Sequence, residues 1–435
     1  MGTAYPPIRS WVDLLRQTAF QKPDQPAYVF LSDGEKEQER LNYRALDERA
    51  RAIASRLQSF KGAEHRALLL YPSGLEFITA FLGCLYAGVI AVPAPPPHPS
   101  RLKRSFGRLK SIVDDSEPSF VLTTGPLATV LETLNQENSE FPKMELLITD
   151  AVSNAEAGEW ADPCVDGDKP AFLQYTSGST SIPKGVVVTH GNLLHNESLV
   201  HKAFGHSEGT IVVGWLPLYH DMGLIGNVLQ PLYCGVSCVL MPPAAFLQDP
   251  CRWLSAISRF RATTSGGPSF AYDLCVRKIS SEQREALDLS SWAVAFNGAE
   301  PVRSHTLEQF IAAFGPCGFR REAFYPCYGL AEATLIVSGG ACLSPLNIRS
   351  FDSAALGLNQ SVEVPESTEN ARSLVGCGRS LSSQKIVIVD PDALLECPNG
   401  RIGEIWVSGP SVAQGYWRKP DQTKDVFQAR LAGRE

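Results

Sequence analysis

Residues 171–190, AFLQYTSGSTSIPKGVVVTH, place a loop rich in hydroxyl groups between two apolar, strand-like runs. The loop carries two Gly, one Pro and one Lys among its Ser and Thr residues. In such a hairpin, backbone N–H groups and hydroxyls form a nest for phosphate oxygens, with Lys184 as a point charge and Pro183 stiffening one arm. A flexible hairpin between two strands would have a similar composition. This stretch alone therefore supports both interpretations equally.

The order of Lys184 and Gly185 excludes a Walker P-loop, in which Lys follows Gly and precedes Ser or Thr. Outward from the loop, short β-rich runs alternate with helical patterns such as residues 45–60. The predicted strands cover residues 27–31, 65–71, 119–124, 185–190, 211–216, 236–241, 262–266 and 292–298. Strand–helix alternation predicts an α/β fold with stacked parallel sheets covered by helices.

The pattern changes near residue 376, where two strands, 383–390 and 401–409, follow each other without a helix. This predicts a small antiparallel or barrel-like unit. Residues 91–100 and 349–373 are predicted to be loops. The chain ends on QARLAGRE with a strand pattern in progress, so we expect a cut end and not a natural terminus.

Composition limits the classes of function. The chain has 435 residues, 44% of them hydrophobic, which allows more than one compact domain. A net charge of −7 without a concentrated basic face argues against nucleic-acid binding. Eleven dispersed Cys residues without a CxxC pair indicate reduced thiols. The N-terminus lacks the apolar core of a signal peptide, and the apolar run 77–92 is short for a bilayer, so we expect a cytoplasmic protein without a membrane span.

Three further stretches put polar residues at predicted strand ends, where ligands bind in open α/β sheets. FYPCYGLAEATL (324–335) contains Glu332, a carboxylate suited to Mg²⁺ beside phosphates. FNGAEP (296–301) closes a strand with a turn whose backbone could meet a flat ring. GWLPLYHDMGLIG (214–226) sets Trp215, His220 and Asp221 after another strand. Each stretch alone is an ordinary turn or helix start, but their succession along one chain favours a site.

Together, YTSGSTSIPKG, YGLAE and GEIWVSGPSVAQGYW resemble the motifs of the adenylate-forming superfamily, which includes acyl-CoA synthetases, nonribosomal adenylation domains and luciferases. The resemblance runs from about residue 10 to the end of the chain. LPLYHDMGLIG, SGGPSFAYDLC and YGLAEATL resemble the fatty acyl-AMP ligase branch. The chain has Ser181 where the family usually has Gly, and Ala331 where it usually has Thr. The second departure fits the acyl-AMP branch.

The resemblance implies two stacked, doubly wound, mostly parallel sheets with helices, plus a small distorted β-barrel. The implied divisions are a first α/β subdomain over 1–170, a second over 171–375 and a truncated barrel over 376–435. Residues 341–373 correspond to an extra segment that is thought, in the acyl-AMP branch, to restrain a C-terminal lid. The family's ribose-binding aspartate, hinge and lid lysine would follow the last residue of this chain.

The resemblance also implies the site residues, position by position. The ATP phosphates and pyrophosphate would bind Thr176, Ser177, Gly178, Ser179, Thr180 and Lys184. The adenine would lie on Tyr328 and Gly329, with Gly298, Ala299 and Glu300 along its edge. Mg²⁺ would bind Glu332 and Thr176. The reacting carboxylate and the acyl chain would contact His220, Trp215, Met222, Gly267, Pro268, Ser269, Phe270 and Tyr272. Lys184, Glu332 and His220 would be the catalytic set.

The implied reaction joins a fatty acid to ATP, giving acyl-AMP and pyrophosphate, with Mg²⁺ as cofactor. The acyl group would then pass to the phosphopantetheine of an acyl carrier protein in polyketide, lipopeptide or lipid biosynthesis. Two alternatives stay open. One is an acyl-CoA synthetase, and the other is a module that binds acyl-adenylate without turnover.

Overall fold

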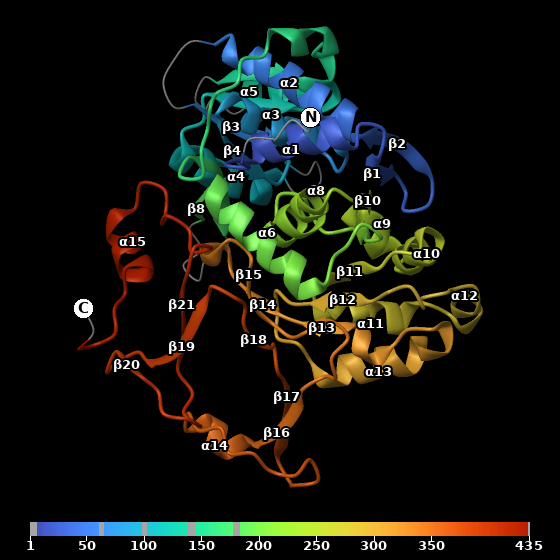
Figure 1. The fold of residues 1–435 in the computed structure, drawn as a ribbon, viewed down its shortest axis with the longest axis vertical. Helices are drawn as coiled ribbons and strands as arrows, with labels where there is room; N and C mark the ends of the chain where they lie inside the picture. Colours follow the sequence, from blue (N-terminus) through green and yellow to red (C-terminus); the bar gives the residue numbers. More distant parts are fainter. Residues whose placement is uncertain (1–6, 61–64, 98–101, 138–143, 177–182, 434–435) are drawn as a thin grey trace, which may run out of the picture.

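The computed structural model describes residues 7–60, 65–97, 102–137, 144–176 and 183–433. Two large sheets with helices against them form the bulk of the chain, and small antiparallel sheets follow towards the C-terminus. In Figure 1 the first large sheet lies at the top, with α1 to α5 around it. The α/β fold class predicted from the sequence is confirmed.

The first sheet has six strands in the order β6-β5-β3-β4-β7-β8, all parallel except the last pair. Their bounds are β3 (Arg66–Leu70), β4 (Ile90–Ala94), β5 (Phe120–Thr123), β6 (Glu145–Ile148), β7 (Pro170–Thr176) and β8 (Lys184–Thr189). β7 and β8 are the two arms of the hairpin expected from the opening stretch. Because their register pairs Thr176 with Lys184, these two residues lie opposite each other at the base of the loop.

The second sheet has seven strands in the order β13-β12-β11-β9-β10-β1-β2, and only β2 is antiparallel to its neighbour. Their bounds are β1 (Pro26–Leu31), β2 (Glu37–Asn42), β9 (Ile211–Gly214), β10 (Ser237–Leu240), β11 (Thr264–Gly267), β12 (Val294–Asn297) and β13 (Phe324–Pro326). β2 is the polar edge strand EQERLN, mostly exposed, and its charges protect the sheet edge from further pairing.

Each large sheet draws strands from both sides of residue 170. β1 pairs with β10, some two hundred residues later, through Tyr28 and Cys238. Conversely, β7 and β8 complete the sheet formed by β3 to β6. β1 is almost wholly buried, so it requires neighbours that cover both of its faces. The sheets therefore do not follow the order of the chain, and the subdomain boundaries inferred from the sequence stay a prediction.

The helices pack their apolar faces against these sheets. α2 shows why: its apolar residues Leu46, Ala50, Ile53 and Leu57 recur at helical spacing and are buried. Asn42 caps its first turn by accepting from the N–H of Ala45. The longer helices are α1 (Trp11–Gln21), α2 (Tyr43–Gln58), α3 (Leu75–Ala87), α4 (Leu102–Ser116), α5 (Gly125–Glu137), α6 (His190–Phe204), α10 (Cys251–Phe260), α11 (Ser269–Lys278), α13 (Ser304–Phe314) and α15 (Pro420–Phe427). The shorter helices are α7 (Asp221–Gly223), a π-helix at Leu224–Leu229, α8 (Gln230–Cys234), α9 (Pro243–Gln248), α12 (Ser281–Glu285) and α14 (Ser353–Gly357).

The C-terminal strands form small antiparallel sheets, as predicted. β14 (Tyr328–Gly329), β15 (Ile336–Gly339) and β18 (Arg379–Ser380) make one, and β19 (Lys385–Asp390), β20 (Leu395–Glu396) and β21 (Glu404–Ser408) another. No sheet closes on itself within the described residues. None of the helices described is long and apolar enough to cross a membrane.

The two loop predictions are partly wrong. Residues 349–373 lie within a hairpin of β16 (Ile348–Asp352) and β17 (Ala371–Val375), with α14 between the strands. Figure 1 shows this hairpin at the bottom, away from the large sheets. Its strands, IRSFD and ARSLV, carry too many polar residues for hydrophobic patterning to reveal them. Of residues 91–100, the first four belong to β4, where Pro93 is tolerated inside the strand.

Candidate active site

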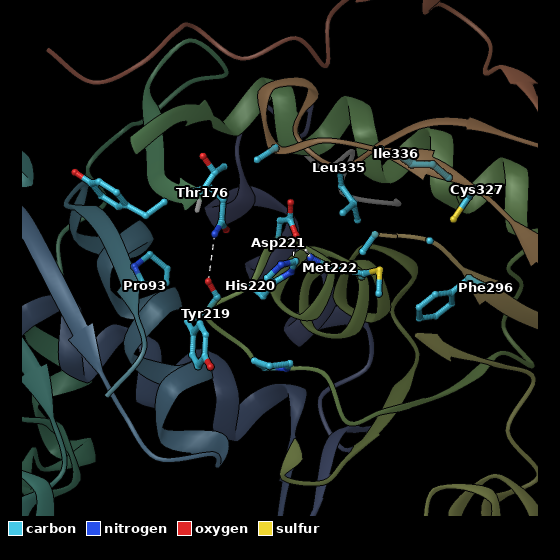
Figure 2. Close-up of a pocket in the computed structure, with 18 of the residues that line it drawn as sticks. Pro93, Thr176, Tyr219, His220, Asp221, Met222, Phe296, Cys327, Leu335 and Ile336 are labelled. Atoms are coloured by element: carbon cyan, nitrogen blue, oxygen red, sulfur yellow. Dashed lines mark hydrogen bonds and ion pairs between the residues drawn. The ribbon is translucent and has the colours of Figure 1, made fainter. Parts of the chain in front are cut away.

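A pocket of about 510 Å³ lies between the two large sheets and β14–β15. Figure 2 shows that its lining changes in character across the view, from Thr176 and His220 on one side to Phe296 and Ile336 on the other. Seven residues predicted from the sequence line it: Thr176, His220, Met222, Gly298, Ala299, Tyr328 and Gly329. The pocket therefore brings together residues from three predicted groups: those for the phosphates, those for the substrate carboxylate and acyl chain, and those for the adenine.

The polar end is built by strand ends of both sheets. Thr176 ends β7, and Lys184 lies opposite it at the start of β8. Gln174, two residues before Thr176, donates from Nε2 to the carbonyl oxygen of Tyr219 at 3.2 Å, which ties β7 to the turn before His220. Residues 177–182, which include the predicted Ser177, Gly178, Ser179 and Thr180, lie outside the described residues.

His220 stands at the end of the turn after β9, directly before α7. Its Nδ1 lies 2.7 Å from Asp221 Oδ1. This hydrogen bond raises the pKa of His220 above its ordinary value, against the effect of burial, so the ring is more readily protonated. Gly223 is required in this turn, because a Cβ there would lie 2.0 Å from the carbonyl oxygen of Pro217. The turn thus presents to the pocket an imidazole that is hydrogen-bonded to Asp221.

The predicted adenine residues come from two neighbouring strand ends. Gly298 and Ala299 follow β12, and Tyr328 and Gly329 form β14. Ala299 has a φ of +65°, a left-handed conformation that is uncommon for a residue with a side chain. Strained backbone of this kind is concentrated at functional sites. The fifth predicted residue, Glu300, instead accepts from the N–H of Phe270 at 2.7 Å, at the start of α11.

Glu332 and Lys184 meet at the ring of Tyr416. The Tyr416 hydroxyl donates to Glu332 Oε1 at 2.6 Å, and Lys184 Nζ lies 4.9 Å from the centroid of the ring. Burial and the bond to Glu332 raise the pKa of Tyr416, so its hydroxyl keeps the proton that it donates. Tyr416 was not among the predicted site residues, although it belongs to the late motif GEIWVSGPSVAQGYW. It brings the predicted cation and the predicted carboxylate to one place.

The apolar end is lined by α6, the π-helix region and β15. Phe204 stacks on Phe296 with ring centroids 6.0 Å apart, and Met222 lies beside Phe296 in Figure 2. The apolar residues that line this end are Val200, Phe204, Met222, Phe296, Leu335 and Ile336. Of these, the sequence predicted Met222 alone, since apolar residues in helices and strands look alike whether they line a core or a pocket.

The residues predicted for the acyl chain at 266–274 lie mostly behind this wall. Gly267 packs against Trp215 so closely that a Cβ would be 2.8 Å from its ring. Trp215 is itself buried and stacks on Phe246 with centroids 4.0 Å apart. Tyr272 is buried, and its hydroxyl donates to the carbonyl oxygen of Phe296. Pro268 and Ser269 begin α11 beside them, and Phe270 is partly exposed. Direct contact of this group with a substrate stays a prediction.

Sequence reasoning missed several polar lining residues, among them Arg108, Gln174 and Tyr219. It noted Asp221 at a strand end but did not predict its bond to His220. Gln174 had a signal: it is the polar residue in the otherwise apolar run AFLQY. Its Oε1 is buried without a hydrogen-bond partner among the described residues, which leaves it free for a ligand. Arg108 had no such signal, because it belongs to the charged face of α4.

Comparison with known proteins agrees with this geometry. The sequence model of the AMP-binding enzyme family matches residues 15–417. The chain belongs to the AMP-binding enzyme family. This confirms the resemblance to the adenylate-forming superfamily, and membership implies that the chain uses ATP.

Among curated members of the AMP-binding family, the chain is similar to the medium-chain-fatty-acid–[acyl-carrier-protein] ligase JamA of Moorena producens. The identity is 47% over 430 residues, covering 98% of this chain and 73% of JamA. The ligase TtuA of Teredinibacter turnerae, of the same description, is 38% identical, covering 94% of this chain and 69% of TtuA.

Among solved structures, the fatty acid AMP ligase from Legionella pneumophila superposes with a TM-score of 0.93 at 40% identity, covering 100% of this chain and 74% of that one. A fatty acyl-adenylate ligase from L. pneumophila in complex with acyl adenylate and pyrophosphate superposes with a TM-score of 0.90 at 42% identity. The match covers 98% of this chain and 73% of that one.

Proposed function

We propose that this chain activates a medium-chain fatty acid with ATP to acyl-AMP and pyrophosphate, and delivers the acyl group to the phosphopantetheine thiol of an acyl carrier protein. One observation carries the proposal: a continuous pocket runs from the phosphate strand to an apolar wall. Such a pocket suits a ligand with a phosphate at one end and a hydrocarbon tail at the other. The names of JamA and TtuA, and the acyl adenylate bound in the Legionella ligase, support the same chemistry.

In the activation step, the protein positions the substrates and stabilises charge, and it forms no covalent bond with them. A carboxylate oxygen of the fatty acid attacks the α-phosphorus of ATP, and the bond to the pyrophosphate oxygen breaks. Lys184, opposite Thr176 at the base of the loop, stabilises the charge on the phosphates. His220 orients the substrate carboxylate. It has no proton to abstract, because the carboxylate attacks in its ionised form.

The residues predicted for Mg²⁺ have the right chemistry for it. Mg²⁺ prefers oxygen ligands and binds through one or two carboxylates together with substrate phosphates. Glu332 offers such a carboxylate, since Tyr416 bonds one of its two oxygens. Thr176 adds a hydroxyl at the end of β7. When bound, the ion would offset negative charge on the phosphates.

A calorimetric titration with non-hydrolysable acyl-AMP analogues tests the proposal. The tails are short, medium and long, and an AMP analogue without a tail is the control. Affinity that rises with tail length supports a joined adenylate and acyl site. Equal affinity for all tails, including none, would remove the acyl part of the proposal. Turnover assays with CoA or a holo-acyl carrier protein then identify the acceptor, and an acyl-CoA product would contradict transfer to a carrier protein.

A further inference from the structure

A compact group of metal-binding side chains lies behind the pocket wall, where α6 packs against α8 (Figure 1). His201 is in the last turn of α6, His206 follows that helix, and Cys234 ends α8. Cys234 Sγ lies 3.3 Å from His201 Nδ1 and 3.5 Å from His206 Nδ1. The three ligand atoms all lie within 4.8 Å of one another. The adenylation chemistry proposed above uses none of them.

The ring of His206 is held in an orientation that suits a ligand. Its Nε2 lies 3.1 Å from Thr264 Oγ1 in β11. A donated hydrogen from Nε2 to this hydroxyl leaves Nδ1 unprotonated and directed at Cys234. An outer partner that fixes the tautomer in this way is the usual companion of a metal-binding histidine.

Gln230 supplies a fourth donor atom. One end of its amide lies 3.1 Å from both His206 Nδ1 and Cys234 Sγ. The other end faces the carboxylate of Glu197. Because a carboxylate only accepts, the NH₂ group belongs at the Glu197 end and the amide oxygen belongs at the cluster. The oxygen then lies beside His206 Nδ1 and Cys234 Sγ.

Glu197 gives an independent reason to expect a cation. It is 0% exposed, and its Oε1 has no hydrogen-bond partner in the described part of the chain. No Lys, Arg or His forms an ion pair with it there either. The Gln230 NH₂ group donates to the other carboxylate oxygen, so Glu197 is only partly satisfied, and a nearby positive charge would lower the cost of burying it.

We propose that His201, His206, Cys234 and Gln230 bind a divalent d-block cation, of which Zn²⁺ suits the donor set best. Tetrahedral Zn²⁺ has bonds of about 2.0–2.3 Å to N, O and S, which puts neighbouring ligand atoms about 3.3–3.8 Å apart. The separations of 3.1, 3.3 and 3.5 Å are close to these values, and the ligand atoms of His201, His206 and Cys234 all lie within 4.8 Å of one another. On binding, the thiol of Cys234 loses its proton to solvent, and the Zn–S bond takes its place.

The site would brace the acyl pocket and not take part in the chemistry. His206 packs edge-on against Phe204 with ring centroids 5.5 Å apart, and Phe204 lines the pocket. A metal between α6 and α8 would therefore fix one wall of the pocket. The competing interpretation is a hydrogen-bonded core network of the same side chains without a metal.

Competition with a chromophoric chelator tests the site on the whole 435-residue chain with Zn²⁺ alone. We expect one tightly bound ion per chain, and Cys234→Ser should lose it. Cys317→Ser is the matched control, since Cys317 is also partly buried and donates only to a backbone carbonyl. Glu197→Gln should weaken binding by about 10–100-fold, the usual loss for an outer-shell partner. Equal Zn²⁺ binding by wild type and Cys234→Ser would overturn the proposal.

Cobalt gives a readout that does not depend on the folding of a variant. Co²⁺ bound to the wild-type chain should show the intense visible bands of a tetrahedral site and a near-ultraviolet thiolate charge-transfer band. The Cys317→Ser protein should show the same bands. A Co²⁺ spectrum without the thiolate band would also refute the site and leave the hydrogen-bonded network as the explanation.

Discussion

Substitution of Val200 by Phe should shorten the acyl tail that the pocket accepts. Val200 lies one helical turn before Phe204 on α6, so both face the pocket, and Val200 is only 2% exposed. Phe204 stacks on Phe296, which places this face of α6 at the apolar end. A phenyl ring at position 200 would occupy space that otherwise holds the tail.

The magnitude follows from the methylenes displaced. A ring in place of an isopropyl group excludes about one or two CH₂ groups, each worth about 0.8 kcal/mol when buried. The loss of about 0.8–1.6 kcal/mol corresponds to about 4-fold to 15-fold weaker binding of tails that reach this wall. Tails too short to reach it should bind as they do to the wild type. Val200→Ala, the matched control, should favour longer tails.

The assay is the calorimetric titration of acyl-AMP analogues, with the ratio of long-tail to short-tail affinity as the readout. This ratio cancels any general damage from overpacking, whose cost of about 1–3 kcal/mol would appear in thermal unfolding. An equal loss for every tail length in Val200→Phe would refute the assignment of this wall to the acyl chain. So would shifts of the same sign in the Phe and Ala variants.

Three further predictions concern the polar end. Lys184→Ala and Glu332→Ala should each lower acyl-AMP formation by about 10²-fold or more while the fold survives; near-normal pyrophosphate exchange in either variant would contradict the assigned roles. Tyr416→Phe keeps the ring beside Lys184 but removes the hydrogen bond to Glu332, worth about 1.5–3 kcal/mol for a charged acceptor; we expect a higher Mg²⁺ requirement, and an unchanged Mg²⁺ titration would count against it. Because Asp221 raises the pKa of His220 above 6.5, the stability from this pair is present below pH 6.5 and is lost as the pH rises through the raised value. Affinity for acyl-AMP analogues should fall over the same range, and Asp221→Asn should move that fall to lower pH; identical pH profiles would refute the coupling.

Most strands of the two large sheets could be predicted from the sequence, because they are short β-rich runs between turn signals. β2 could not, since EQERLN is a polar edge whose exposed side chains need no hydrophobic pattern. The sequence also did not predict which of the two large sheets each strand joins. The apolar residues of β1 indicate only that this strand is buried. Its pairing with β10 depends on tertiary packing.

The candidate site was likewise predicted only in part. Residues in Gly-containing strand-end turns, such as Gly298 and Tyr328, were predicted and line the pocket. The apolar wall was not predicted from the sequence. Val200 and Phe204 have the same residue types and helical spacing as core residues, and differ from them only in facing a pocket. Gln174 carried a detectable signal, a polar side chain in an apolar strand, that sequence reasoning did not use.

Tyr416 explains why three motifs far apart in the chain occur together. Its segment runs beside β8, with the N–H of Val187 donating to Gly415 and that of Trp417 to Gly185. The same segment reaches the third motif, since the N–H of Ala413 donates to the carbonyl oxygen of Glu332 at 2.9 Å. β8, the Glu332 turn and the late motif are thus one hydrogen-bonded unit. A shift of the late segment would separate Tyr416 from both Glu332 and Lys184. The geometry of the proposed phosphate site would therefore depend on residues that need not touch a phosphate.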